Sequence, residues 1–303
     1  RGFDDADGLR GPALVRGPGC TVVIDPGWSA TLHPNGMRLR DAGGGPKRVG
    51  MVFDPIHTAV LGSRLMGIAE QMGERLARLA RSVSIRERRD FSCAIFDGRG
   101  QLVCNAPHIP VHLGAMGETV RSLVREQADR LGPGQHWCCN DPYAGGSHLP
   151  DITVMSPIFW GDATKPALFV ASRGHHIDVG GSRPGSMPAF STHIDEEGVR
   201  IRHHRLVENG RFIAPDLPGC REPEEVRADL EAQVAAGTFA IDRLEQVMGE
   251  LGGEILTAQM GHLMSQAEQA VADIWSELLQ VKQVNQRSNF FTLGGDSLVA
   301  TRL

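Results

Sequence analysis

Aromatic side chains are scarce in this sequence, where Phe, Trp and Tyr together make up 5% of the 303 residues. Gly (37) and Pro (18) are abundant instead, which predicts many turns and loops. No apolar run reaches the roughly 18 residues of a membrane-spanning helix, and the N-terminus lacks the charged-then-apolar order of a signal peptide. We therefore expect a cytoplasmic protein with no membrane partner, and the start at Arg1 suggests a piece of something longer.

The sequence also lacks any CxxC pair. Its six Cys are spread along the chain, apart from the neighbours Cys138 and Cys139, which favours buried thiols in a reducing compartment over a disulfide framework. The net charge of −5 gives no electrostatic reason to expect a nucleic acid as partner. The hydrophobic (41%) and charged (22%) fractions are those of a globular protein with a sizeable core.

Three familiar catalytic motifs are missing as well, namely the GxxxxGK[ST] phosphate loop, the GxSxG nucleophile turn and the HExxH zinc motif. Gly43-Gly44-Gly45 precedes Pro46-Lys47 and is typical of a linker rather than of a phosphate-binding loop. If the protein uses ATP, its nucleotide site is not visible in this chain.

The hydrophobic pattern predicts a mixed α/β fold, preceded by short strands and turns within residues 1–50. Apolar residues at helical spacing predict helices over 54–81, 116–131 and 223–270, and β-branched or apolar runs predict strands over 21–24, 91–96, 101–104, 152–159 and 167–172. Two loops, 140–151 and 174–192, are dense in Gly, Pro, His and Asp. Such loops on a rigid scaffold are where function is expected.

His and Asp cluster in these two loops. His148 and Asp151 are three residues apart in Ser-His-Leu-Pro-Asp, and His175-His176 precede Asp178 and two glycines. Imidazole and carboxylate together are the ligand set of a Zn- or Mn-type catalytic site. The spacing also fits a simpler interpretation, in which Gly and Pro shape tight turns while His and Asp satisfy backbone groups.

Longer stretches of residues 54–262 resemble the N-terminal half of the hydantoinase B/5-oxoprolinase family. The matching segments are IAEQMGERLARLARSVSIRERRDFSCAIFD (68–97), NAPHIPVHLGAMGETV (105–120), NDPYAGGSHLPDITVMSPIFW (140–160), VASRGHHIDVGGSRPGSMPAFST (170–192), DLEAQVAAGTFAIDRL (229–244) and QMGHLMSQAE (259–268). The resemblance implies a hydantoinase B-like domain over residues 50–268, with metal-binding loops.

The same resemblance implies the site residues. The metal ligands would be Asp90, His148, Asp151 and His175, for a divalent Zn, Mn or Fe ion, with His176 as the alternative to His175. Four further residues are candidates for roles around the metal, and each has a structural alternative. His108 and His112 would line the substrate pocket or pack in the core, Arg173 would clamp an anion or form a salt bridge, and Asp178 would orient a ligand His or shape a turn.

The mechanism that the resemblance implies needs a partner. A hydantoinase A-like region would bind ATP and phosphorylate a small cyclic amide such as 5-oxoproline or a hydantoin. A metal-bound water of the B-type part would then attack the activated ring carbonyl. Residues 11–40 resemble the C-terminal end of the A-type partner, so residues 1–45 are interpreted as its tail.

The end of the chain suggests a different origin. Residues 267–303, with FFTLGGDSL at 290–298, resemble the start of a peptidyl carrier domain of nonribosomal peptide synthetases. The resemblance implies a partial, helical carrier domain over 269–303, phosphopantetheine on Ser297, and peptide synthetase modules as partners. The alternative for Ser297 is a plain helix cap.

Two other functions remain open at this stage. The chain would be a non-catalytic module joined to the carrier segment, or a metal-dependent amidase that needs no ATP. Ring opening tested with and without an A-type partner separates these hypotheses from the ATP-dependent hydrolase.

Overall fold

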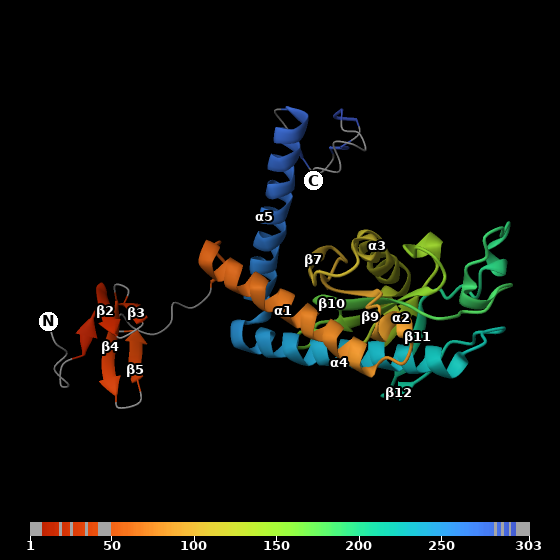
Figure 1. Cartoon of the computed structure of the whole chain (residues 1–303), viewed down its shortest axis with the longest axis horizontal. Coiled ribbons are helices and arrows are strands. Elements are labelled where there is room, and N and C mark those ends of the chain that lie inside the picture. Colours follow the sequence, from red (N-terminus) through yellow and green to blue (C-terminus); the bar gives the residue numbers. More distant parts are fainter. Residues whose placement is uncertain are drawn as a thin grey trace. The chain divides into compact units, whose positions relative to one another are not determined.

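The computed structural model describes residues 8–17, 20–24, 27–33, 36–41, 50–281, 284–285, 288–290 and 292–294. The chain divides into two compact units, residues 1–49 and 50–303 (Figure 1). The first unit holds the expected short strands. A three-stranded sheet has the order β1-β4-β5, and β2 and β3 form a hairpin. The bounds are β1 Leu9–Arg10, β2 Ala13–Gly17, β3 Cys20–Ile24, β4 Trp28–His33 and β5 Gly36–Asp41.

The second unit is built on a seven-stranded sheet with the order β12-β11-β8-β9-β10-β6-β7, in which all neighbours are antiparallel. The bounds are β6 Phe91–Asp97, β7 Leu102–Asn105, β8 His136–Cys139, β9 Asp151–Ile158, β10 Leu168–His175, β11 His204–Glu208 and β12 Arg211–Phe212. The four strands predicted between 91 and 172 are confirmed. Strands β8, β11 and β12 were not predicted, because they are too short to show an alternating pattern.

The helices largely follow the predicted ranges. They are α1 Pro55–Leu79, α2 Val83–Arg86, α3 Pro110–Gln127, α4 Pro223–Leu251 and α5 Gly253–Leu279, with short 3-10 turns η1 Ala128–Arg130, η2 Pro142–Ala144, η3 Pro184–Ser186 and η4 Ile194–Glu196. Asp54 caps α1 by accepting from the backbone N–H groups of Ile56 and His57.

Two helix predictions were wrong in their bounds. Helix α3 begins at Pro110 rather than near Met116, since Pro is favoured in the first turn of a helix, where its missing N–H costs nothing. The predicted single helix over 223–270 is two helices, separated at Gly252, whose φ of +86° takes the backbone out of the helical region.

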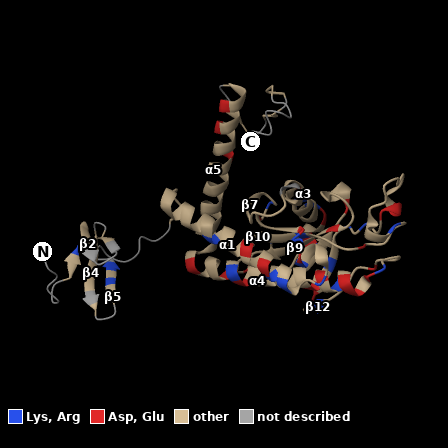
Figure 2. Cartoon of the chain, viewed as in Figure 1, with Lys and Arg blue, Asp and Glu red and all other residues tan. Residues whose placement is uncertain are grey.

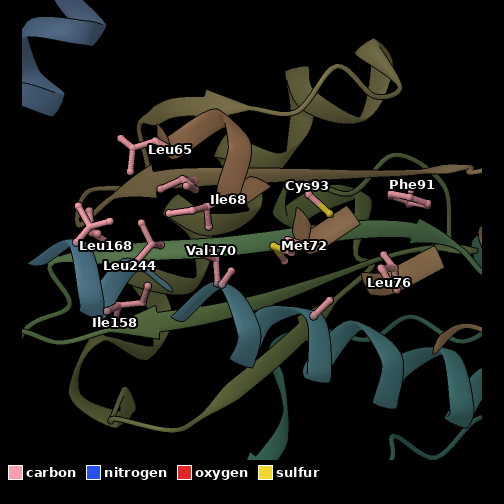
Figure 3. Packing of buried hydrophobic residues seen from close by; sticks show 14 of the residues in the cluster. Leu65, Ile68, Met72, Leu76, Phe91, Cys93, Ile158, Leu168, Val170 and Leu244 are labelled. Atoms are coloured by element: carbon pink, nitrogen blue, oxygen red, sulfur yellow. The ribbon is translucent and has the colours of Figure 1, made fainter. Parts of the chain in front are cut away.

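Helices α1 and α4 cover one face of the sheet. Leucine, isoleucine and methionine side chains from α1 pack with Leu244 of α4 against the strands (Figure 3); the labelled residues are Leu65, Ile68, Met72, Leu76, Phe91, Cys93, Ile158, Leu168, Val170 and Leu244. Each fully buried side chain of this size stabilises the fold by about 1.5–3 kcal/mol. Helix α4 carries acidic residues and fewer basic ones along its length (Figure 2).

Helix α3 covers part of the opposite face. Its side chains Met116, Val120 and Leu123 are buried among residues from four strands, which are Ala94, Phe96, Trp137, Cys139, Met155, Phe169 and Ala171. The sheet is therefore sandwiched between helices over its central strands.

Helix α5 packs against α1 through a buried amide. Gln259 accepts a hydrogen bond from the Thr58 hydroxyl (2.7 Å) and donates to the carbonyl of Gly50 (2.7 Å). The helix continues without a break past residue 268, the predicted end of the family domain. Ser297, the predicted phosphopantetheine site, lies outside the described residues. Within the described part of the chain, no helix has the length and apolar character that crossing a membrane requires.

Candidate functional site

The register of the central strands brings distant polar residues onto one face of the sheet. Asp151 of β9 and His175 of β10 are directly paired, and the backbone N–H of His175 donates to the carbonyl of Asp90 (3.0 Å). Two residues along, Thr153, Arg173 and Ser92 form the next row. Because side chains alternate across a strand, both rows face the side that α3 covers.

Asp151 is the centre of the first row. One carboxylate oxygen, Oδ2, lies 2.9 Å from Nδ1 of His148 and accepts from the Ser147 hydroxyl at 2.7 Å. The other, Oδ1, lies 3.1 Å from Nδ1 of His175. His112 places its Nε2 3.4 Å from Oδ2. The Asp151 side chain is 2% exposed, so four side chains surround one buried carboxylate.

This environment controls the ionisation of Asp151. Burial alone raises its pKa, but hydrogen bonds from His112, His148, His175 and Ser147 outweigh that effect and hold the pKa well below the usual range of an aspartate. In turn, the hydrogen bond to Asp151 raises the pKa of His148 against the opposing effect of burial. Asp151 is therefore a carboxylate anion at neutral pH.

Three of the four predicted metal ligands meet. Ligand atoms of His148, Asp151 and His175 all lie within 4.8 Å of one another, and within the part of the chain that the structure describes this is the one such group of His, Cys, Asp and Glu. Neighbouring ligands about 2.1 Å from a tetrahedral or octahedral ion are about 3.0–3.4 Å apart. The observed distances of 2.9 and 3.1 Å between imidazole nitrogen and carboxylate oxygen suit that spacing. The residues thus fit a divalent cation.

Asp90, the fourth predicted ligand, lies beside this group. Its Oδ1 is 3.7 Å from Nε2 of His112, and its side chain is 37% exposed. His148 is also partly exposed, at 35%, so the cluster opens to solvent on the side of these two residues. The structure links Asp90 to Asp151 through His112.

The neighbours His175 and His176 point to opposite faces of the sheet. His175 faces Asp151, whereas His176 is fully buried under α4, where its Nε2 lies 2.9 Å from Oε1 of Gln233. Gln233 also donates to the carbonyls of Ile152 and Ser172. Of the two alternatives left open by the sequence, His175 is the one in the cluster.

Arg173 is fully buried, and its hydrogen-bond partners among the described residues are hydroxyl and carbonyl oxygens rather than carboxylates. Its guanidinium donates to the hydroxyls of Thr153 (2.7 Å) and Thr119 (2.9 Å) and to the carbonyl of Gly145 (2.8 Å). Burial lowers the pKa of Arg173, and the charge of Asp151 acts in the opposite direction. The observed contacts tie α3, β9 and the loop that carries His148 together, and the clamp on an anion stays a prediction.

His108 and Asp178 have other neighbours. Nδ1 of His108 accepts from the backbone N–H of Cys93 (3.1 Å), and its ring packs edge-on against Phe91. Asp178 accepts from the N–H of Gly180 and pairs with Arg221 (3.0 Å). For both residues these contacts match the structural alternative, a packing histidine and a turn residue.

Two further residues support the cluster from positions beside the predicted ligands. Ser147 stands in the motif itself, four residues before Asp151, and its hydroxyl fixes Oδ2. Asn140 is buried, and its side-chain amide donates to the carbonyls of Leu149 (2.8 Å) and Val199 (3.0 Å) while accepting from the N–H of Ile201 (2.6 Å). It joins two loops far apart in sequence, which no local pattern signals.

The fold agrees with comparisons to known proteins. The profile of the family "Hydantoinase B/oxoprolinase" matches residues 54–291, so the chain belongs to this family. The match extends beyond residue 268 into the segment predicted as a carrier domain.

Several curated relatives are 5-oxoprolinases. The chain is 40% identical over 285 residues to 5-oxoprolinase 1 of Arabidopsis thaliana and 40% identical over 274 residues to 5-oxoprolinase of Dictyostelium discoideum, in each case covering 88% of this chain and 22% of the relative. One component of a putative D-/L-hydantoinase of Pseudomonas sp. is 31% identical over 236 residues, which cover 75% of this chain and 39% of the relative. The chain thus spans about a fifth of the length of these 5-oxoprolinases.

Solved structures share the fold. The ATP-dependent caprolactamase of Pseudomonas jessenii aligns with a TM-score of 0.68 at 24% identity, over 77% of this chain and 40% of that chain. Nucleotide-free acetone carboxylase aligns with a TM-score of 0.69 at 20% identity, over 74% of this chain and 30% of that chain. These likenesses support the mixed α/β fold.

Proposed function

We propose that this chain is the metal-binding, B-type part of an ATP-dependent hydrolase of cyclic amides such as 5-oxoproline or a hydantoin. The observation that carries the proposal is the buried Asp151 carboxylate with the imidazoles of His148 and His175 on its two oxygens. Family membership and the 5-oxoprolinase relatives support the substrate class.

In this proposal the cation is held by His148, Asp151 and His175, with Asp90 at the open side as the fourth ligand. A divalent ion bound there would lower the pKa of a coordinated water and polarise a carbonyl oxygen. The protein's own contribution is to keep Asp151 ionised and fixed. The Ser147 hydroxyl orients Oδ2, and Arg173 anchors the loop carrying His148 by holding the Gly145 carbonyl.

Activation of the amide by ATP is assigned to a hydantoinase A-like partner or fused region. An amide carbonyl is a poor electrophile, and phosphorylation of its oxygen creates a good leaving group. The Pseudomonas hydantoinase is named as an assembly of separate components, and the caprolactamase is ATP-dependent, which together support this division of labour. The predicted tail of such a partner, residues 1–45, belongs to the same proposal.

The carrier segment remains a separate proposal. Phosphopantetheine on Ser297, and a link to peptide synthetase modules, rest on the resemblance of residues 267–303 alone. A mass shift after incubation with coenzyme A and a phosphopantetheinyl transferase, absent in Ser297→Ala, is the direct test.

The hydrolase proposal is tested first by metal content. We expect the purified chain to hold Zn, Mn or Fe in near one-to-one ratio, and Asp151→Asn to lose it while remaining folded by circular dichroism. The exposed pair His193–Asp195, with nitrogen and oxygen 3.3 Å apart, offers a matched control, because Asp195→Asn removes a similar contact from the surface. Equal metal content in wild type and Asp151→Asn contradicts the site.

Activity is tested next with a supplied A-type partner. We expect 5-oxoproline or hydantoin opening only when partner, ATP and metal are all present, and none with Asp151→Asn. Ring opening by the chain alone would select an ATP-independent amidase instead. A metal-loaded chain that opens no ring with its partner would be the non-catalytic module.

A further inference from the structure

His112 occupies a position that the four-ligand set does not explain. It lies in the first turn of α3, and its side chain is 4% exposed. Its Nε2 is 3.4 Å from Oδ2 of Asp151 and 3.7 Å from Oδ1 of Asp90, so a single nitrogen lies within reach of two carboxylates. A histidine that only packs in the core does not place a ring nitrogen between two anions.

The other ring nitrogen is also fixed. Nδ1 lies 3.4 Å from the hydroxyl of Ser92, whose single proton is shared between this nitrogen and the carbonyl of Ile109 (3.0 Å) just before α3; with the ring proton on Nε2, Nδ1 is the acceptor. Ser92 belongs to β6, two residues after Asp90. The start of the helix and the strand that carries Asp90 thus hold the imidazole from both sides, with its Nε2 directed at the carboxylates.

His112 and Asp90 both lie outside the group of three ligand atoms, and the chemistry of Nε2 separates their roles. Ligands about 2.1 Å from one ion are at most about 4.2 Å apart. In the described part of the chain, one ligand atom from each of His148, Asp151 and His175 lies within 4.8 Å of the other two. This group includes neither His112 nor Asp90. Carboxylate oxygens only accept hydrogen bonds, so a nitrogen facing two of them acts best as an N–H donor.

We propose that His112 is a positioning residue of the metal site. Its Nε2–H holds the Asp90 and Asp151 carboxylates towards each other, offsets their mutual repulsion, and keeps Asp90 ready to complete the set formed by His148, Asp151 and His175. This inference rests on the metal site of the proposed function. It assigns to His112 a task at the metal rather than contact with the substrate.

The test compares His112→Leu with His112→Gln. The leucine removes the donor, whereas the glutamine amide nitrogen reaches about the position of Nε2 and keeps an N–H there. We measure Zn²⁺ and Mn²⁺ affinity by competition with a chelator, and the visible spectrum of the Co²⁺ form. His112→Leu should weaken cation binding by about 10–100-fold, the usual effect of losing a partner that orients a ligand, and His112→Gln should recover most of it.

His108→Gln is the matched control. His108 lies in the same segment and packs against Phe91, and its hydrogen bond goes to the backbone of Cys93 rather than to a carboxylate. Its substitution should leave cation affinity unchanged. Unfolding temperatures of all variants show whether a loss of affinity merely reflects a loss of fold.

Two outcomes overturn the inference. If His112→Gln loses as much affinity as His112→Leu and alters the Co²⁺ spectrum, the imidazole is a ligand itself. If His112→Leu is folded and binds as wild type, His112 has no role at the metal. Should His112→Leu fail to fold, His112→Asn combined with Asp90→Asn decides, because the asparagine amide is too short to reach the carboxylates and strictly additive losses contradict action through Asp90. If the wild type binds no cation, the proposed function itself is contradicted.

Discussion

At the scale of single residues, the direction of a side chain decides its chemistry. His175 and His176 are neighbours in sequence, yet one faces Asp151 and the other Gln233 under α4. Their burial differs as well, since the His175 side chain is 20% exposed and His176 is fully buried. Alternation along β10 separates a candidate ligand from a core residue.

A histidine away from the site gives a prediction about pH. His136 of β8 is buried, with Nδ1 2.6 Å from the Ser156 hydroxyl, and burial lowers its pKa to about 4. In the unfolded chain the pKa of His136 is near 6.5. Between pH 6.5 and 4 the unfolded state therefore binds a proton on His136 that the folded state does not bind, and the free energy of unfolding decreases as the pH is lowered. The full effect is about 3 kcal/mol, complete below pH 4.

The measurement is urea unfolding of wild type and His136→Gln between pH 8 and 4. The variant is expected to be less stable at pH 8, because it loses buried contacts, but to lose less stability on acidification. Parallel curves for the two proteins across this range would show that His136 takes up its proton over the same pH range in the folded and unfolded states, against the prediction.

At the scale of elements, the conformation of the loop between β8 and β9 is set by its close contact with α3. Gly145 has a φ of +88°, and a Cβ there would meet the backbone of Thr119 and Glu118. The Gly145 carbonyl also accepts from Thr119 and Arg173. This contact fixes the loop that carries Ser147 and His148, so the loop and α3 form one structural element of the site.

We predict that Gly145→Ala destabilises the protein by about 2–4 kcal/mol, because it combines backbone strain with a clash against backbone atoms that cannot rotate away. Cation affinity should fall with it. Gly134 serves as the control, since it has a φ of +71° and nothing within 4 Å of its Cβ. Thermal unfolding and chelator competition measure both effects. Equal losses for Gly134→Ala and Gly145→Ala would show that strain alone is responsible.

At the scale of the whole molecule, the chain consists of two separate units. The cluster of His148, Asp151 and His175, the seven-stranded sheet and its covering helices all belong to residues 50–303. A chain lacking residues 1–49 is therefore expected to keep its cooperative unfolding transition and its cation affinity unchanged. Calorimetry tests the unfolding transition, and chelator competition tests the cation affinity. A tenfold loss of cation affinity would show that residues 1–49 contribute to cation binding, against the prediction.

Much of the fold was predictable because it depends on local periodicity. The apolar repeat of α1 and the alternation or apolar runs of β6, β9 and β10 are local signals, and the structure confirmed all four elements. The long pattern over 223–270 concealed a break, since one Gly at residue 252 does not disturb the average periodicity. The short strands β8, β11 and β12 carry too few residues to show a period.

The sequence by itself determined the family, the mixed α/β fold and the candidate ligands, because these depend on residue types in local order. Only the tertiary structure decided which of them meet. Antiparallel pairing set Asp151 opposite His175, and the docking of α3 brought His112 between Asp90 and Asp151. It also turned Arg173, His108 and Asp178 towards structural contacts. Such choices depend on strand register and helix packing, which arise from contacts between residues far apart in the chain.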